Sequence, residues 1–220
     1  MTKRFEDELN ELKKKLLEMG SLVEEMINSS VKALVDRKPE ITKEVFLKEE
    51  EVNRKQIEID EMCLKLLALQ QPIAADLRFI TSAMKINSDL ERMGDQAINI
   101  AETGEHLAKQ PPLKPLIDIP RMAETVKIMV KESLDAFVRS DAKLAQAVLL
   151  KDDEVDALKD QLFRELITYM MADSGNITRS LDLILIARNL EKIGDHATNI
   201  SEDVIFMVLG KDVRHNMDNK

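Results

Sequence analysis

A thirteen-residue pattern occurs twice in this chain, one hundred residues apart. The first copy, LERMGDQAINIAE, begins at Leu90, and the second, LEKIGDHATNISE, begins at Leu190. Eight of the thirteen positions are identical, and each copy keeps a glycine inside an otherwise helix-forming stretch. Self-similarity at a fixed spacing indicates a fold built from repeated units. The pattern therefore restricts the chain to an architecture with two similar halves.

The repeat extends beyond this pattern. A shift of 103 residues aligns VKALV, from Val31, with LDAFV, from Leu134, and EEEVN, from Glu49, with DDEVD, from Asp152. Because the glycine-bearing pattern repeats after 100 residues instead, three residues are missing from the second half, between its second and third helical segments. Deletions of this kind are tolerated at turns.

Helix breakers divide each half into three segments. Leu, Ile, Ala, Met, Glu and Lys dominate, no alternating strand pattern occurs, and the chain has only six glycines and six prolines. We expect helices at 5–36, 41–69, 72–109, 120–138, 141–171 and 175–209. Pro72 suits the first position of the third helix. The predicted fold is all-α, with two tandem three-helix bundles, at 1–110 and 111–220, forming an elongated, duplicated six-helix protein.

Charge and hydropathy exclude several classes of protein. The net charge is −9, and Lys and Arg are dispersed, which argues against binding to nucleic acid or to an anionic membrane surface. The longest apolar run, LDLILIA from Leu181, is too short to span a membrane, and the amino terminus lacks the apolar stretch of a signal peptide. The lone Cys63 excludes a disulfide framework. We therefore expect a soluble, cytoplasmic protein without membrane insertion.

Acidic and amide side chains form a stripe on the third helix of each half. The first stripe, at i, i+4, i+8 and i+11, consists of Glu91, Asp95, Asn99 and Glu102. The second half repeats it with Glu191, Asp195, Asn199 and Glu202. No Lys or Arg interrupts either stripe. The second helix of each half adds an i, i+4 pair, which is Glu49 with Asn53 in the first half and Asp152 with Asp156 in the second.

These side chains form candidate metal sites if the second and third helices are antiparallel neighbours. Carboxylates gathered without cations repel one another, and a bound hard cation relieves that repulsion. An all-oxygen site suits Mg, Mn, Ca or ferric iron, with zinc as a further option. The commoner alternative is a solvated acidic helix face. Gly94 and Gly194 fit close helix packing or, less often, room for a ligand cluster, and we expect His106 and His196 at the surface.

Known catalytic motifs are absent from the sequence. It has no phosphate-binding loop, dinucleotide fingerprint, nucleophile elbow or CxxC site, so we do not expect an enzyme. Two alternatives stay open. One is a metal-dependent enzyme that hydrolyses a phosphate ester on the carboxylate clusters. The other is a general helical scaffold or chaperone cofactor whose acidic stripes are solvated.

The two copies of the pattern resemble the PhoU family, together with QQPIAADLRFITSAMKINSD before the first and NITRSLDLILIARN before the second. The resemblance covers essentially the whole chain. It implies a cytoplasmic negative regulator of phosphate uptake and of the phosphate-starvation regulon, commonly a homodimer. The implied partners are PstB, the ATPase subunit of the Pst phosphate ABC transporter, and PhoR, the phosphate-sensing histidine kinase. We expect a contact switch that docks on both.

The resemblance also implies a cofactor, because some members of the family bind multinuclear iron or zinc clusters through E/D-x-x-x-D pairs. Other hard divalent ions, such as Mg or Mn, suit the same oxygen ligands. In this sequence the pairs fall on Glu91 and Asp95, Glu191 and Asp195, and Asp152 and Asp156. The fourth pair departs from the pattern, because Asn53 stands where it asks for Asp. We therefore expect the first half to bind metal more weakly or not at all.

Overall fold

The computed structural model describes residues 3–213, which form seven α-helices and two short 3-10 turns without a strand. The helices are α1 (Lys3–Asp36), α2 (Thr42–Gln70), α3 (Ala74–Ala108), α4 (Asp118–Arg139), α5 (Ala142–Leu149), α6 (Asp152–Ala172) and α7 (Ile177–Leu209). The 3-10 turns, Pro39–Ile41 and Ser174–Asn176, precede α2 and α7. The prediction of an all-α fold is confirmed.

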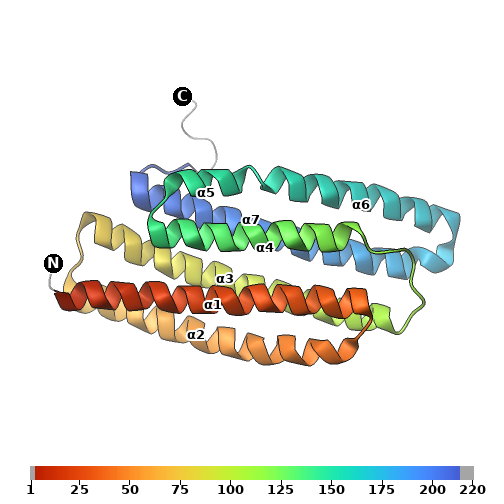
Figure 1. Cartoon of the computed structure of the whole chain (residues 1–220), viewed down its shortest axis with the longest axis horizontal. Helices are drawn as coiled ribbons and strands as arrows, with labels where there is room; N and C mark the ends of the chain where they lie inside the picture. The colour runs from red at the N-terminus through yellow and green to blue at the C-terminus, as the bar shows by residue number, and fades with distance from the viewer. Residues whose placement is uncertain (1–2, 214–220) are drawn as a thin grey trace.

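The helices lie side by side along one long axis and give the molecule an elongated shape (Figure 1). Helices α1, α2 and α3 pack together as the first half, and α4 to α7 pack together as the second. The halves meet mainly where α3 packs on α7, with a second contact between α1 and α4. Buried residues of all seven helices form one continuous hydrophobic core, so the two halves share their interior.

The internal repeat holds at the level of single buried residues. Val52 and Ile59 of α2 are fully buried, and so is Val155 of α6, while Leu162 is 1% exposed. These residues correspond through the shift of 103. The apolar residues at corresponding positions of α3 and α7 are also fully buried, namely Leu90, Met93, Ala97 and Ile100 with Leu190, Ile193, Ala197 and Ile200. Each half therefore presents equivalent helix faces to its core.

Two predicted helix boundaries are wrong. The expected helix at 141–171 is divided into α5 and α6, with Leu150 and Lys151 between them. The acidic run of Asp152, Asp153 and Glu154 forms the first turn of α6, where carboxylates interact favourably with the helix dipole. Pro72 also lies outside α3, because Gln71 adopts a left-handed conformation (φ 45°) that ends α2 and the next helix begins only at Ala74.

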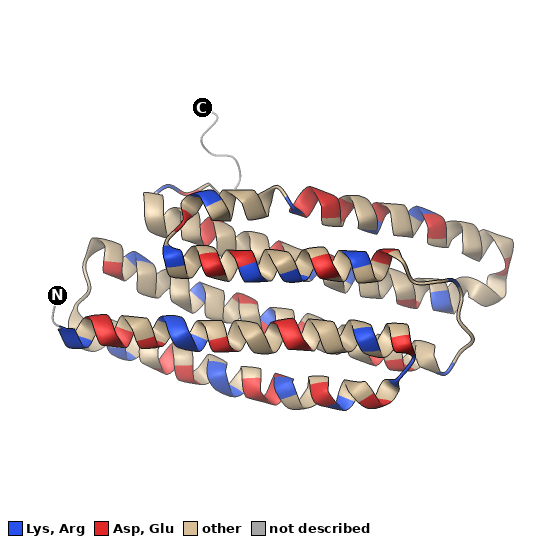
Figure 2. Ribbon diagram, in the orientation of Figure 1, with Lys and Arg blue, Asp and Glu red and all other residues tan. Residues whose placement is uncertain are grey.

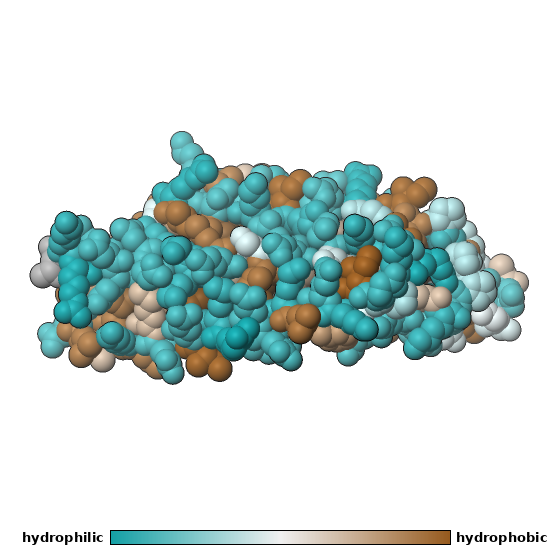
Figure 3. Space-filling view, turned by 60° about the horizontal axis from the view of Figure 1, so that its bottom comes forward, coloured by the Kyte–Doolittle hydropathy of each residue, from teal (hydrophilic) through white to brown (hydrophobic). Residues whose placement is uncertain are grey.

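Charged side chains of both signs alternate along the helices, as Figure 2 shows. The space-filling view of one face shows hydrophobic side chains that interrupt a mostly hydrophilic surface (Figure 3). Several large hydrophobic residues remain well exposed, including Phe163, Leu181 and Leu185. None of the helices within residues 3–213 combines the length and the apolar character needed to cross a membrane.

Candidate functional site

Four carboxylates of the second half lie close together across two helices. Asp152 and Asp156 belong to α6, and Glu191 and Asp195 belong to α7. Burial raises the pKa of Asp152 to about 6, and the charges of Asp195, Asp156 and Glu191 contribute to the same shift. Asp152 also lies against the glycine of the repeated pattern, since a Cβ placed on Gly194 would be 3.5 Å from its Oδ1 atom. The predicted convergence of the α6 pair on the α7 stripe is therefore present.

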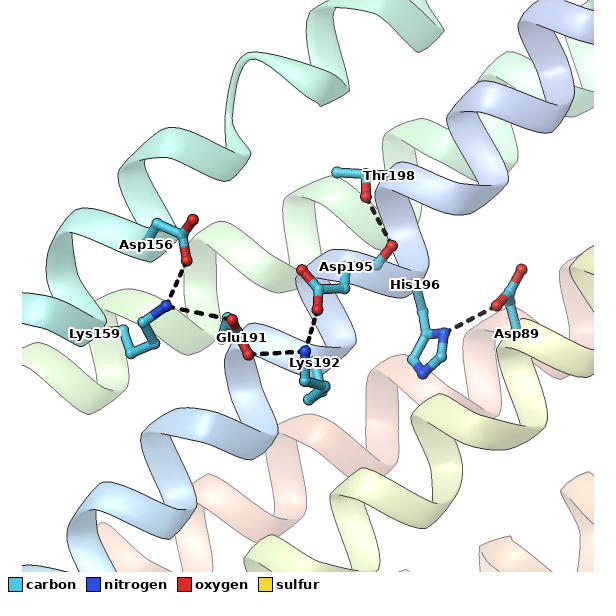
Figure 4. A network of polar contacts seen from close by, with 8 residues as sticks. All are labelled: Asp89, Asp156, Lys159, Glu191, Lys192, Asp195, His196 and Thr198. Atoms are coloured by element: carbon cyan, nitrogen blue, oxygen red, sulfur yellow. Dashed lines mark hydrogen bonds and ion pairs between the residues drawn. The ribbon is translucent and has the colours of Figure 1, made fainter. Parts of the chain in front are cut away.

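Two lysines accompany these carboxylates (Figure 4). Lys159 Nζ donates to Asp156 Oδ1 at 2.8 Å and to Glu191 Oε1 at 3.3 Å. Lys192 Nζ lies 3.4 Å from Glu191 Oε2 and also donates to Asp195. The hydrogen bond to Asp156 is the largest of the effects that raise the pKa of Lys159. The expectation of carboxylates without cations is wrong in this half, because Lys159 reaches across from α6 and Lys192 pairs with its neighbours on α7.

The first half has the same arrangement with weaker charge. Burial raises the pKa of Glu91, and the nearby charges of Asp95 and Glu49 raise it further, while Arg92 opposes them. Asn53 Nδ2 donates to Glu49 Oε1 at 2.5 Å. The structure therefore brings these predicted residues together. Glutamine stands at position 56, where the second half has Lys159, so no lysine bridges the helices at this point.

The outer members of each stripe lie apart from these clusters. Asn99 and Glu102 are exposed on α3. Asn199 and Glu202 line a different hollow, of about 310 Å³, between α3 and α7. Helix geometry explains the separation, since i+8 and i+11 place these residues about 12 and 16 Å along the axis from the first carboxylate.

The carboxylates of both clusters supply only oxygen ligands, which is the donor chemistry that hard cations prefer. Within residues 3–213, no three His, Cys, Asp or Glu side chains are arranged to hold a metal ion. In the second half the carboxylate oxygens face Lys159 and Lys192 instead. The residues thus fit a hard cation chemically, and such an ion would have to displace the lysine ammonium groups.

Comparison with known proteins assigns the chain to a family. The sequence model of the PhoU domain matches it twice, at residues 16–104 and 119–204. The chain belongs to the PhoU domain family. It is 42% identical over 216 residues to the phosphate-specific transport system accessory protein PhoU homolog of Pseudomonas putida, which covers 98% of this chain and 84% of the relative. The homolog of Aquifex aeolicus is 44% identical and covers 94% of each chain.

Solved PhoU structures have the same fold. The crystal structure of PhoU from Pseudomonas aeruginosa matches with a TM-score of 0.90 at 41% identity, covering 94% of this chain and all of that one. The phosphate transport system regulatory protein PhoU from Streptococcus pneumoniae matches with a TM-score of 0.87 at 30% identity, covering 95% and 99%. The PhoU fold therefore extends over nearly the whole chain.

The two PhoU domains are joined by contacts that the sequence did not reveal. His196 Nδ1 lies 2.9 Å from Asp89 Oδ1, and only 14% of the histidine side chain is exposed, so the expectation of a surface residue is wrong here. His106 Nδ1 lies 2.7 Å from Asp182 Oδ2 and is well exposed. Lys85 Nζ, 2.7 Å from the Oδ1 atom of Asp203, forms a third contact across the seam between α3 and α7.

Proposed function

We propose that this PhoU protein restrains phosphate uptake and the phosphate-starvation regulon through contacts with PstB and PhoR on the cytoplasmic side of the membrane. The observation that carries the proposal is the near-complete match to accessory proteins of phosphate-specific transport systems. The fold supports it physically, because its long helices present extended faces for partners. The proposal assigns no catalytic step to the chain.

A binding experiment with purified components tests this function. The full chain is mixed with PstB and, separately, with the cytoplasmic part of PhoR, with and without nucleotide, and binding is followed by interferometry. We expect saturable binding to both proteins. Absence of binding to either one under all conditions would overturn the proposed regulatory role.

We further propose that the second-half cluster is the stronger metal site. Asp152, Asp156, Glu191 and Asp195 would hold a hard cation or a multinuclear iron or zinc cluster, which would supply positive charge in place of the lysines. The support is that all four ligands are carboxylates, whereas the first half has Asn53.

Elemental analysis of the reconstituted protein tests this, with Asp195→Ala and Asp95→Ala as the matched pair. We expect a larger loss of metal for Asp195→Ala, and a metal content near zero in the unmutated protein would refute it.

A further inference from the structure

A groove of about 430 Å³ lies between α6 and α7, next to the carboxylate cluster of the second half. Ile184 and Ala187 of α7 and Phe163 of α6 form its apolar lining. Arg188 also lines the groove, as do Lys159 and Lys192, which lie beside the carboxylates (Figure 4). Asp160 and Glu191 also line the groove, which therefore combines apolar side chains with charged side chains of both signs.

The two halves differ at the positions that form this groove. In the first half, Asn87 Nδ2 of α3 donates to the carbonyl oxygen of Gln56 at 2.9 Å and to Asp60 Oδ1 at 2.9 Å, which binds α2 to α3. In the second half Ala187 corresponds to Asn87, and Phe163 corresponds to Asp60. The polar bridge is thus replaced by a methyl group and an exposed aromatic ring, and the space between the helices opens.

Exposed apolar side chains lie on α7 next to the groove, because Leu181 and Leu185 precede its lining residues Ile184 and Arg188 by about one helical turn. Leu181 and Leu185 are 48% and 47% exposed, and Phe163 is 48% exposed. The corresponding first-half positions of the two leucines carry Thr81 and Lys85, which are polar. Contiguous exposed apolar surface edged by polar groups marks interaction sites in proteins. These side chains give the α6–α7 face of the second half the composition of a docking surface, although the first half exposes other large hydrophobic residues on α2, such as Ile57 and Leu64.

The charges of the groove indicate what kind of partner fits. Lys159 and Lys192 already have carboxylate partners within the fold. Arg188 is exposed and makes no ion pair with any residue in the described part of the chain. It lies three and seven residues after Leu185 and Leu181, on the same side of α7. A ligand that covers Leu181 and Leu185 would also lie against the Arg188 guanidinium. A carboxylate on that ligand would accept two hydrogen bonds from the guanidinium.

We propose that the groove between α6 and α7 binds an amphipathic helix of a partner protein, with apolar anchors at i and i+4 or i+7 and a carboxylate that pairs with Arg188. A helix fits because the groove runs between α6 and α7, which lie side by side (Figure 1). Side chains spaced at i, i+4 and i+7 project from one face of a helix and could enter this groove together. The inference rests on the proposed function, since that function works through protein contacts.

Site-specific cross-linking in cells tests the inference. A photoreactive phenylalanine analogue replaces Leu181 in the full chain, and the control carries it at Leu77, which is 42% exposed and lies on the corresponding face of α3. We expect a discrete cross-link only from position 181. Mass spectrometry of the cross-linked peptide should identify a helical segment with apolar anchors and an acidic residue, and the synthetic segment should bind the purified chain.

Arg188→Glu provides the specific variant, and Arg188→Lys keeps the charge. We expect Arg188→Glu to weaken binding of the identified segment at least tenfold, and Arg188→Lys to weaken it less. Circular dichroism verifies that the variants fold. A cross-link to a second copy of the chain, equal yields at positions 77 and 181, no cross-link, or unchanged binding of Arg188→Glu would each overturn the inference. A segment from a protein other than PstB or PhoR would leave the groove assignment standing and count against the proposed function.

Discussion

The carboxyl group of Asp152 has a pKa of about 6 in the folded chain, compared with an ordinary value of 3.8. The folded state therefore holds this proton more tightly than the unfolded state, and stability falls as the pH rises from about 4 through 6. Asp152→Asn removes this pH-dependent contribution. We expect the variant to be more stable than the unmutated protein at pH 8, by about 1 kcal/mol after allowance for partial solvent exposure. At pH 4 the difference should vanish.

Urea denaturation between pH 4 and pH 8, in the presence of a chelator, measures this effect. Asp153→Asn is the matched control, because Asp153 occupies the same first turn of α6 but is exposed. It removes a similar interaction with the helix dipole but only the smallest of the carboxylate charges that raise the pKa of Asp152, so its effect on the pH profile should be much smaller. Equal pH profiles for the two variants would contradict our explanation.

Lys159 acts as an internal counter-ion, and its replacement by the first-half residue should expose that role. Lys159→Gln leaves Asp156 and Glu191 without their bridging cation. We expect the metal-free variant to lose about 0.5–1 kcal/mol of stability. Its affinity for Zn²⁺ should rise severalfold, because the metal no longer displaces an ammonium group. Denaturation with chelator and calorimetric titration measure the two effects.

An exposed lysine with no ion pair among residues 3–213 serves as the control for this variant. Lys65 of α2 meets that condition, so Lys65→Gln should change neither quantity. If Lys159→Gln and Lys65→Gln have the same Zn²⁺ affinity, the lysine does not compete with metal at this cluster.

At the scale of helices, glycines have different roles at different contacts. A Cβ on Gly20 of α1 would lie 2.2 Å from the Cδ1 atom of Leu134 in α4, which is a severe overlap in the buried core. A Cβ on Gly94 would meet Val52 and Met26 only at 3.5 and 3.6 Å, which is ordinary contact. A side chain at Gly20 would therefore require Leu134 to move within the buried core, whereas packing alone does not require a glycine at position 94.

Alanine substitutions at these two glycines should have opposite effects. Gly94→Ala should raise the free energy of unfolding by up to about 1 kcal/mol, because alanine favours the helix. Gly20→Ala gains the same helix propensity but overpacks the core, and we expect a net loss of about 1 kcal/mol. Guanidinium denaturation measures both, and a stabilising Gly20→Ala would show that Leu134 moves aside freely.

Helices and their buried faces were predictable from the sequence because periodicity and breakers are local signals. The division between α5 and α6 was missed since no Pro or Gly marks it, although the acidic run from Asp152 to Glu154 is a typical helix start. The clusters were predicted because the repeat places their carboxylates in register. The bridge from Lys159 to Glu191 was not, because it depends on how far a long side chain reaches between helices. The contact between Asp89 and His196 was not predicted either, because it depends on how α3 packs on α7.

At the scale of the whole molecule, the two halves should unfold together. Phe79 of α3 stacks on Phe137 of α4 with ring centroids 5.0 Å apart, and the core is continuous across this contact. We expect one calorimetric transition whose measured and van't Hoff enthalpies agree. Phe137→Ala should lower stability by about 3–5 kcal/mol while keeping a single transition. Two resolved transitions in the unmutated protein would show that each half folds independently.

The contacts across the seam have a consequence for the duplication itself. Through the shift of 100 residues, Lys85 corresponds to Leu185 and Asp203 corresponds to Thr103. If the halves exchanged places, Leu185 and Thr103 would therefore stand where Lys85 and Asp203 now form an ion pair. The same exchange converts the other two contacts into uncharged pairs, namely Gln96 with Asn189 and Ser82 with Phe206. Two identical halves could not reproduce any of the three. The two halves are therefore complementary and not interchangeable. An assembly of two copies of either half alone would lack all three contacts.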